Sequence, residues 1–449
     1  MIGSDEGGVR TLSVLQAGSI LVGIVVGIGI FKTPQLVAAN VGSESEFLAL
    51  WLVGGLLMIA GAFTYAELGS AFPSSGGEYH YLVRAYGRGM GFVFAFGRMT
   101  VMQTGAIAAV AFAYGDYANT LFPLGDFGST IHATVSIALF TGLQFFGTSI
   151  SGRSQLTLTM LTIAILLLLA AALPFAEAPA SQPTASSSTG AAGLALVFIL
   201  LTYGGWNEAA YLAGDIRDVQ RNMVRVLLLG TSTVIVLYLV YNSALLYAFG
   251  LDGLREAKTI VDGPAAEVFG PAGTVVAALV VCAAAISTLN ATIFTGARSI
   301  YSLGKDYPAL ALLGRRSART GSPVAALLVQ GAIALALVAL GAGAHDGFQA
   351  MVEYTAPAFW TFLFLVGLAF FVFRWRGIGS PSAFRTPFYP LPPLVFCAMC
   401  LYLIYSSVMY TGAGALVGLA IVSAGIPVYW LSRGGRGRVI RPAEAIPAE

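Results

Sequence analysis

Apolar runs of about 20 residues recur along the whole length of this 449-residue chain, and a run of this length can cross a lipid bilayer as an α-helix. Only 10% of the residues are charged, whereas a soluble globular protein has roughly a quarter. The chain therefore carries too little charge to cover a water-facing surface of its size. These patterns predict an all-α integral membrane protein.

About twelve transmembrane helices fit these runs. We place them at residues 12–40, 47–72, 88–122, 129–149, 154–175, 192–213, 223–250, 265–303, 322–343, 347–375, 388–409 and 412–432. The low-complexity segment 177–191 is expected to be an extracellular loop. Residues 1–11 lack the basic start of a cleavable signal peptide and are expected to form a cytoplasmic N-terminus. The tail 433–449 is basic and then rich in Pro, Ala and Glu, and we expect it to be cytoplasmic.

The basic residues are distributed unevenly. All but three of the 23 Lys and Arg residues fall in segments that we place in the cytoplasm or at the helix ends that face it, the exceptions being Lys32, Arg255 and Lys258. By the positive-inside rule, both termini of this multi-pass protein are then cytoplasmic. The expected location is the cell (plasma or inner) membrane, so the lipid bilayer is a partner, whereas a net charge of +2 does not imply nucleic acid.

Glycines interrupt two of the expected helices. Residues 23–34 read GIVVGIGIFKTP, and residues 200–208 read LLTYGGWNE. A broken helix in lipid is tolerated only where it lines a cavity or a site. Two breaks at matching positions of two halves predict a substrate site at the bilayer midplane of a secondary transporter. We therefore expect two inverted repeats, at 12–176 and 192–375, followed by two more helices within 376–432.

The first interruption can bind an anion. The N-terminal end of a half-helix carries a partial positive charge, so the backbone amides of Gly27, Ile28 and Gly29 can face a carboxylate. Glycine also lets a ligand approach the backbone closely. The alternative for Gly27 and Gly29 alone is helix packing, which often uses glycine pairs in membranes.

The opposite ends of the interrupted helices can bind an amine. The backbone carbonyls of Val25, Leu201 and Gly204 are candidates to accept hydrogen bonds from an ammonium group. A zwitterion with a carboxylate and an amine on one carbon matches such a site without any charged side chain. An amino acid is therefore the expected substrate.

Polar and aromatic side chains follow the second interruption. Trp206 is a candidate wall of the side-chain pocket or an ordinary core or lipid contact, and Asn207 is a candidate donor to the substrate or a pin between the breaks. Glu208 is a costly carboxylate within a membrane segment, so we interpret it as a proton carrier or a contact for a cationic side chain, or as a structural carboxylate facing a polar cavity. On the eighth helix, Ser287 and Thr288 can bind a sodium ion or bond to neighbouring backbone.

Other chemistry is not indicated. The three cysteines, Cys282, Cys397 and Cys400, all lie in apolar runs, and we infer no disulfide, no metal site and no cofactor. No pairing of a nucleophile with a base is visible, which argues against an enzyme. The outer loops lack a cysteine for a covalently attached subunit, so no obligatory protein partner is predicted.

Four parts of the chain resemble the amino acid–polyamine–organocation (APC) superfamily and, within it, the L-type amino acid transporter (LAT) group. They are 27–34 (GIGIFKTP), 65–69 (YAELG) with 72–79 (FPSSGGEY), 203–207 (YGGWN) with 215–222 (DIRDVQRN), and 384–393 (FRTPFYPLPP). The resemblance implies a leucine-transporter-type fold of five-plus-five inverted helices with two more, in which helices 1 and 6 are unwound. It also implies alternating access and L-amino acids as substrates. By the same resemblance, amides at 27–29 hold the carboxylate, and carbonyls at 25, 201 and 204 hold the amine.

Three positions depart from the family pattern. Ile28 stands where many relatives have a small polar residue, and Leu201 stands where several have an aromatic gate. Ile165 aligns with a lysine that often substitutes for a sodium ion, and residues 154–175 contain no lysine. The departures bear on how the substrate is enclosed and on which ion is coupled.

The leading hypothesis is an amino-acid exchanger, uniporter or proton-coupled symporter, with protons or sodium as the candidate coupling ions. One alternative is a carrier of cationic amino acids or polyamines, in which Glu208 meets the extra positive charge. Another is an amino-acid sensor that binds its ligand without moving it.

Overall fold

A computed structural model describes residues 12–74, 76–146, 151–172, 192–256, 266–343, 346–411 and 413–433. Its helices, in chain order, are α1 (Val14–Val25), α2 (Gly29–Ala38), α3 (Glu44–Ala71), α4 (Gly77–Tyr86), α5 (Arg88–Gly97), η1 (Arg98–Met102), α6 (Gln103–Leu121), α7 (Gly128–Leu143), η2 (Gln144–Phe146), α8 (Ser151–Ala172), α9 (Ala192–Thr202), η5 (Trp206–Leu212), α10 (Val219–Glu256), α11 (Ala266–Asp306), η7 (Pro308–Leu310), α12 (Val324–Gly341), α13 (Gly347–Arg376), α14 (Leu391–Thr411) and α15 (Ala413–Arg433). The expected N-terminal segment 1–11, the loop 177–191 and the tail after residue 433 lie outside the described residues.

The all-α membrane fold is confirmed. Within the described residues, nine helices are long and apolar enough to cross a membrane, and the bent pair α1 and α2 gives a tenth span. The expected fifth and sixth spans correspond to α8 and to α9 with η5. Because α9 has only 11 residues, the count of twelve spans stays a prediction.

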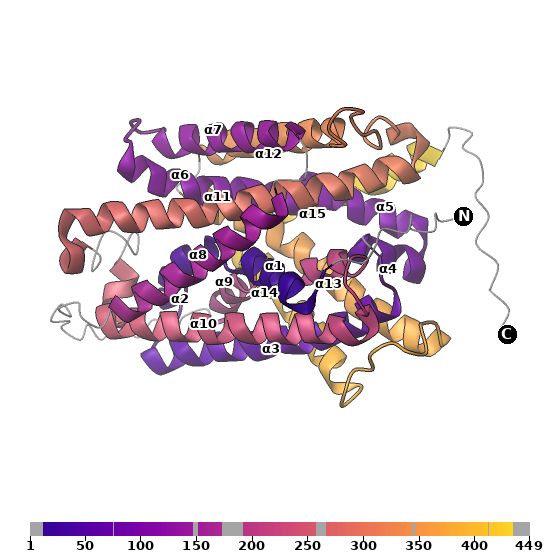
Figure 1. The fold of residues 1–449 in the computed structure, drawn as a ribbon, viewed down its shortest axis with the longest axis horizontal. Helices are drawn as coiled ribbons and strands as arrows, with labels where there is room; N and C mark the ends of the chain where they lie inside the picture. The colour runs from indigo at the N-terminus through magenta and orange to yellow at the C-terminus, as the bar shows by residue number, and fades with distance from the viewer. Residues whose placement is uncertain are drawn as a thin grey trace.

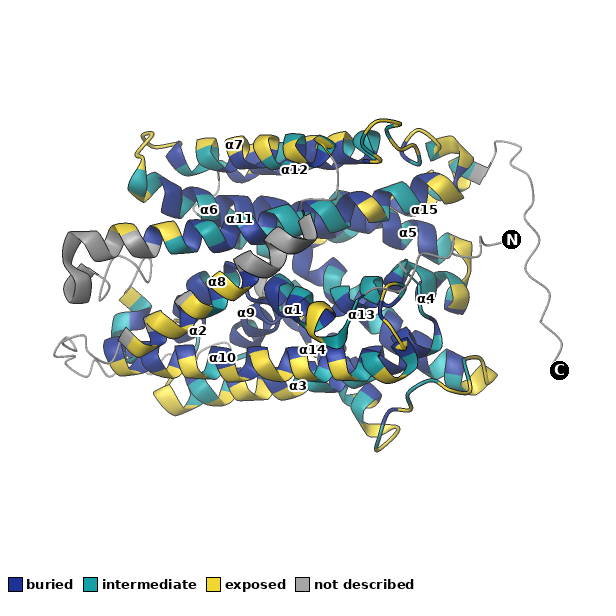
Figure 2. Ribbon diagram, viewed as in Figure 1, coloured by how far each residue is buried: buried dark blue, intermediate teal, exposed yellow. Residues whose placement is uncertain are grey.

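The helices form a bundle in which α3, α7, α10, α11 and α12 run in similar directions and α8 crosses them obliquely (Figure 1). In Figure 1, α3 and α10 lie side by side along one face, α7 and α12 lie along the opposite face, and α1 and α9 lie between them. Figure 2 shows that the outward sides of α3, α7, α10 and α12 are exposed while the centre is buried. Leu56, Leu139, Val236 and Leu328 are among the exposed apolar side chains, as expected for surfaces that face lipid.

The first interruption separates α1 from α2. Helix α1 begins with a capping box between Ser13 and Gln16 and ends at Val25. The backbone amide of Gly27 turns back to the carbonyl of Val25 at 2.8 Å. The axis of α2 is bent by 48° from that of α1. The chain therefore leaves the α-helix after Val25, at the end of α1, and resumes it at Gly29, the second glycine of the GIG motif.

The second interruption separates α9 from the short 3-10 helix η5. Helix α9 ends at Thr202, and Gly205 has a left-handed backbone with φ of +102°. A side chain at Gly205 would be strained there and would also lie 2.9 Å from the side chain of Ile24. Gly205 therefore lets the end of the sixth segment turn directly beside the first interruption.

The third span contains a π-helical turn, η1, between α5 and α6. Such turns within α-helices are frequent at functional sites. Arg98 begins this turn and is only 3% exposed. The distribution of basic residues predicts Arg98 in a cytoplasmic segment or at a cytoplasmic helix end, and this prediction is wrong because the Arg98 side chain is buried inside the bundle.

Candidate functional site

A cavity of about 230 Å³ lies between the two interruptions. The first interruption contributes Val25, Gly27, Ile28 and Gly29 to its lining, and the second contributes Leu201, Gly204, Gly205, Asn207 and Glu208. Helices α6, α11 and α13 supply most of the remaining wall, which includes Thr288. The fold thus brings together nearly all of the candidate residues, from segments about 175 residues apart in the sequence.

Two candidate residues are not among those that line this cavity. The ring of Trp206 packs against Tyr65 and Phe396, with ring centroids 4.9 and 6.0 Å away. Trp206 therefore belongs to the packed core and not to the cavity wall. Ser287 is buried beside the lining residue Thr288, whose hydroxyl donates to the carbonyl of Ala284 at 3.1 Å.

The glycines of the first interruption leave little room for a side chain. A Cβ atom on Gly27 would lie 2.7 Å from the hydroxyl oxygen of Thr288. One on Gly29 would lie 3.3 Å from the side chain of Thr202. The backbone at these positions is therefore pressed against α11 and α9, and α2 starts with its first-turn amides at the edge of the cavity.

One tyrosine joins the ends of both interrupted helices. The hydroxyl of Tyr238, on α10, lies 2.8 Å from the carbonyl oxygen of Val25 and 3.4 Å from that of Thr202. The carbonyl of Val25 thus has two donors, because the Gly27 amide also bonds to it. The carbonyl of Leu201 accepts the Gly204 amide at 2.9 Å.

A buried group of charges forms one end of the cavity. Nη2 of Arg98 donates to Oε1 of Glu208 at 2.7 Å, and Nη1 lies 3.5 Å from Oε2 of Glu78 on α4. The Arg98 guanidinium also stacks over the ring of Tyr211 at 4.6 Å. We call Glu78, Arg98 and Glu208 the buried triad. Two carboxylates therefore share one guanidinium next to the cavity.

Glu78 is held by further donors. Its Oε1 accepts from the hydroxyl of Tyr65 at 2.6 Å and from Nδ2 of Asn207 at 2.9 Å, and its Oε2 accepts from the hydroxyl of Tyr211 at 3.2 Å. Burial raises the pKa of Glu78, and the Arg98 guanidinium opposes this rise. Asn207 therefore links the second interruption to α4.

Sequence reasoning missed Arg98 and Glu78. Arg98 lies in the interior of the expected 88–122 span, and a charged residue at such a depth is by itself a signal of function. Glu78 lies outside the expected spans, and its signal is its place in the FPSSGGEY stretch of the family resemblance. It is buried where α4 meets Tyr65 of α3, Arg98 of η1 and Asn207 of η5.

A second group of polar contacts lies on the other side of the first interruption. Nζ of Lys32, in the first turn of α2, lies 2.6 Å from Asp116 on α6 and 3.5 Å from Asp346 at the start of α13. The hydroxyl of Thr202 donates to that of Thr33 at 2.6 Å. These contacts tie α2 to α6, α9 and α13.

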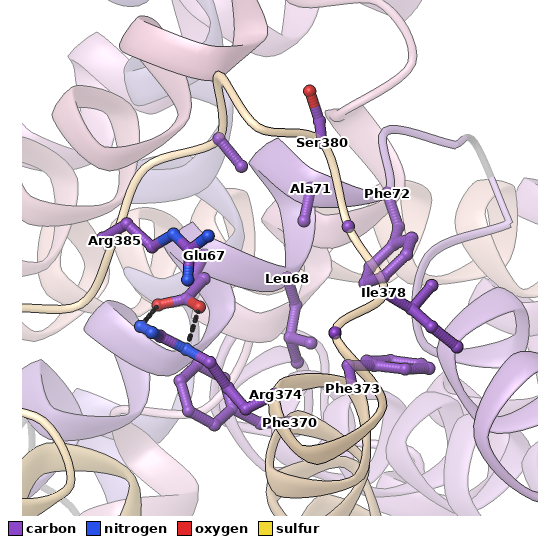
Figure 3. Close-up of a pocket in the computed structure, with 13 residues that line it drawn as sticks. Glu67, Leu68, Ala71, Phe72, Phe370, Phe373, Arg374, Ile378, Ser380 and Arg385 are labelled. Atoms are coloured by element: carbon purple, nitrogen blue, oxygen red, sulfur yellow. Dashed lines mark hydrogen bonds and ion pairs between the residues drawn. The ribbon is translucent and has the colours of Figure 1, made fainter. Parts of the chain in front are cut away.

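A smaller cavity, of about 80 Å³, lies where α3 and α13 end (Figure 3). Glu67 of the YAELG motif pairs there with Arg374. Nε of Arg374 lies 2.6 Å from Oε1 of Glu67, and Nη2 donates to Oε2 at 2.8 Å. The amide of Thr386, in the FRTP motif, donates to the same carboxylate at 2.7 Å. Two of the four stretches that carry the family resemblance therefore meet at one ion pair, which fixes the segment that leads into α14.

Two interrupted helices around a shared cavity, in a bundle of helices that can cross a bilayer, define a multi-pass membrane transporter. The family model described as amino acid permease matches residues 12–431, and the chain belongs to this family of the APC superfamily. It is accordingly a secondary transporter of amino acids and not an enzyme.

Several known proteins are similar to this chain over most of its length. The serine/threonine exchanger SteT of Bacillus subtilis is 26% identical over 435 residues, which cover 95% of this chain and 97% of SteT. The b(0,+)-type amino acid transporter 1 of Mus musculus is 26% identical over 411 residues, with 89% and 83% covered. The human large neutral amino acids transporter small subunit 2 is 25% identical over 449 residues, with 96% and 82% covered.

Proposed function

We propose that this chain carries L-amino acids across the cell membrane by alternating access, as an exchanger or a proton-coupled symporter. The observation that carries the proposal is the single cavity that both interruptions line. Relatives that are named as a serine/threonine exchanger and as amino-acid transporters support the same substrate class.

The backbone of the substrate binds between the two interruptions. Its carboxylate lies against the amides of Gly27, Ile28 and Gly29, at the positive end of α2. Its amine lies against the carbonyls of Leu201 and Gly204. The amide of Gly27 now bonds to the carbonyl of Val25. When that amide turns to the carboxylate of the substrate, the carbonyl of Val25 becomes available to the amine.

The chain is organised as two five-helix repeats, 12–176 and 192–375, followed by two helices, with both termini in the cytoplasm. The backbone of Leu12 pairs with Asp215 and Arg217, so the residue just before α1 lies beside the basic loop after the sixth segment. At the other side, Arg255 bonds to Asp252 and to the carbonyl of Ala38. The positive-inside rule places the first of these sides in the cytoplasm.

The transporter works without an obligatory protein partner. One relative is named as a small subunit. In this chain, however, Cys282, Cys397 and Cys400 are the only cysteines, and all three are buried. No thiol is therefore available at the surface for a disulfide to another subunit.

The test is uptake of a panel of labelled L-amino acids into proteoliposomes that contain the purified chain alone. Empty vesicles with a proton gradient and vesicles preloaded with unlabelled amino acid are compared. Uptake that needs preloading establishes an exchanger, and uptake driven by the gradient into empty vesicles establishes a symporter. Binding without any flux would contradict the proposal and favour an amino-acid sensor.

A second candidate is a carrier of cationic amino acids or polyamines. Glu208 lines the cavity and favours this candidate, because a carboxylate there can meet an additional positive charge on the substrate.

Sodium coupling through Ser287 and Thr288 is the alternative to proton coupling. Repeating the uptake assay with and without sodium separates the two ions.

A further inference from the structure

The smaller cavity, where α3 and α13 end, is lined by an arginine that no acidic side chain neutralises (Figure 3). The charged residues of its lining are Glu67, Arg374 and Arg385. Glu67 already pairs with Arg374 and accepts the amide of Thr386. Arg385 is exposed and makes no hydrogen bond or ion pair within the described residues. A guanidinium is therefore available at this cavity for an external anion.

Two more arginines lie at the rim of the same cavity. The guanidinium of Arg84, on α4, stacks over the ring of the lining residue Phe72 at 5.2 Å. Nη1 of Arg376 donates to the carbonyl of Ala85 at 3.3 Å, which places it next to Arg84. Both arginines are exposed. Four arginines thus gather around one glutamate, and the excess of three positive charges attracts anions.

Large apolar side chains stand exposed beside these arginines. Trp375, at the end of α13, is 86% exposed, and Phe388, just before α14, is 84% exposed. Ile378 and Leu391 are exposed as well. Exposed apolar groups next to a polar rim mark contacts with a membrane or a partner, and aromatic residues are enriched at the level of the lipid headgroups. We therefore place the cavity at the membrane–water interface.

An anion with hydrocarbon chains attached to it matches both features. A phosphate group fits between the guanidinium groups of Arg84 and Arg385, while acyl chains lie against Trp375 and Phe388. A free anion would use the arginines alone and leave the aromatic side chains uncovered. The proposed orientation puts this end of the bundle in the cytoplasm, where the leaflet carries anionic lipids and basic pockets between helices bind their headgroups.

We propose that this cavity binds the headgroup of one anionic phospholipid, with Arg84 and Arg385 as the groups that hold its phosphate. The lipid then joins α4 to the segment between α13 and α14. Because α13 also supplies Phe348 and Phe359 to the wall of the transport cavity, the bound lipid stabilises the position of that wall. Binding here depends on the proposed orientation of the chain and not on its substrate.

The test follows the melting temperature of the purified chain in a neutral detergent. Phosphatidylglycerol, phosphatidylcholine or inorganic phosphate is added in separate titrations. Phosphatidylglycerol should raise the melting temperature by a few degrees and reach saturation, because a ligand that binds only the folded state stabilises it. Phosphatidylcholine at the same mole fraction and inorganic phosphate should have little effect. Native mass spectrometry should show phosphatidylglycerol retained on the folded chain.

Variants identify the site. Arg385→Gln should weaken phosphatidylglycerol binding about fivefold, and the double variant with Arg84→Gln about twentyfold or more, since each guanidinium near an anionic headgroup contributes separately. Phe388→Ala should also weaken it. Arg319→Gln is the matched control: it makes the same change of charge on an exposed residue before α12, on the opposite face of the bundle from α3 (Figure 1). It should bind as the unchanged chain. Without lipid, all these variants should melt at similar temperatures because the side chains are exposed.

Three outcomes would overturn the inference. Equal stabilisation by phosphatidylcholine would show a general effect of lipid. Full stabilisation by inorganic phosphate would identify a site for a free anion. Unchanged phosphatidylglycerol binding in the Arg84→Gln and Arg385→Gln double variant would place the lipid elsewhere. None of these measurements uses amino-acid flux, so failure of the proposed transport function would be seen separately.

Discussion

The hydroxyl of Tyr238 donates to the carbonyl oxygen of Val25 at 2.8 Å. Through this bond a residue of α10 holds the end of the first half-helix, and the same hydroxyl lies 3.4 Å from the carbonyl of Thr202 at the end of the second. The two interruptions are thus connected by one buried side chain. Because an interrupted helix leaves its last carbonyls without intrahelical donors, a partner of this kind stabilises the open backbone.

Replacing Tyr238 by Phe should destabilise the substrate-free transporter. The carbonyls of Val25 and Thr202 lose a donor, which costs about 1–3 kcal/mol and lowers the apparent melting temperature in detergent. The KM for amino acids should rise severalfold, since the site is less well ordered before binding. Tyr241→Phe is the matched control, because the hydroxyl of Tyr241 is buried on the same helix without a hydrogen-bond partner in the described structure. Equal melting temperatures for the two variants would contradict this role of Tyr238.

Replacing Gly27 by Ala should abolish most transport while the protein still folds. The new Cβ would lie 2.7 Å from the hydroxyl oxygen of Thr288, so the Thr288 side chain or the backbone of the first interruption must shift and the carboxylate site is distorted. Gly18→Ala on α1 is the control, because a Cβ there meets nothing within 4 Å. Transport is measured by exchange in proteoliposomes after size-exclusion chromatography has shown that each variant is folded.

A second substitution tests the cause of that loss. In a Gly27→Ala chain, Thr288→Ala removes the hydroxyl and methyl groups nearest to the new Cβ. Exchange should recover partly in the double variant, because the two residues are in direct contact and their effects are not additive. A double variant that is as inactive as Gly27→Ala would show that the loss does not come from this contact.

Replacing Lys32 by Met should favour conformations that are open at the α2 side of the cavity. The substitution removes both ion pairs, to Asp116 and to Asp346, that tie α2 to α6 and α13. A cysteine at Phe348, which lines the cavity, then reacts severalfold faster with a membrane-impermeant thiol reagent that is added outside. Lys32→Arg keeps the charge and should react at the original rate. Unchanged labelling in Lys32→Met would exclude a role in closure.

Replacing Arg374 by Ala should lower stability more than replacing Arg376 by Ala. Arg374 faces both carboxylate oxygens of Glu67, and its loss leaves that carboxylate with the Thr386 amide as its remaining partner here. Because the pair is partly exposed, we expect a cost of about 2–3 kcal/mol. Arg376, on the same helix end, is exposed and makes one bond of 3.3 Å to a backbone carbonyl. Melting temperatures of the two variants in detergent provide the measurement.

The sequence is most informative where the backbone itself forms the site. Gly27, Gly29, Gly204 and Gly205 are required by close approach or by a left-handed backbone, and these needs are visible in the amino-acid types. Helix α1 ends at Val25 and helix α9 ends at Thr202, in each case within two residues of one of these glycines. Apolar runs likewise place most of the spans, since a bilayer imposes a minimum length on each helix.

Side-chain pairing is much less predictable. Arg98 and Glu208 lie 110 residues apart, and their contact depends on how η1 and η5 are rotated about their axes. The side chain of Trp206 packs in the core, while Asn207 donates to Glu78 and Glu208 accepts from Arg98. The three side chains differ because neighbouring residues of a 3-10 helix point in different directions. Such rotations are decided by packing across the whole bundle, which one sequence does not display.

The most direct measurement is competition in counterflow, with labelled amino acid entering proteoliposomes that are preloaded with the same unlabelled amino acid. The competitors are that amino acid, its methyl ester and the amine that remains after decarboxylation. If the interruptions hold both backbone groups, only the intact zwitterion competes well, and the ester and the amine are at least about tenfold weaker. Equal competition by the amine or the ester would show that the carboxylate is not held at the amides of the first interruption.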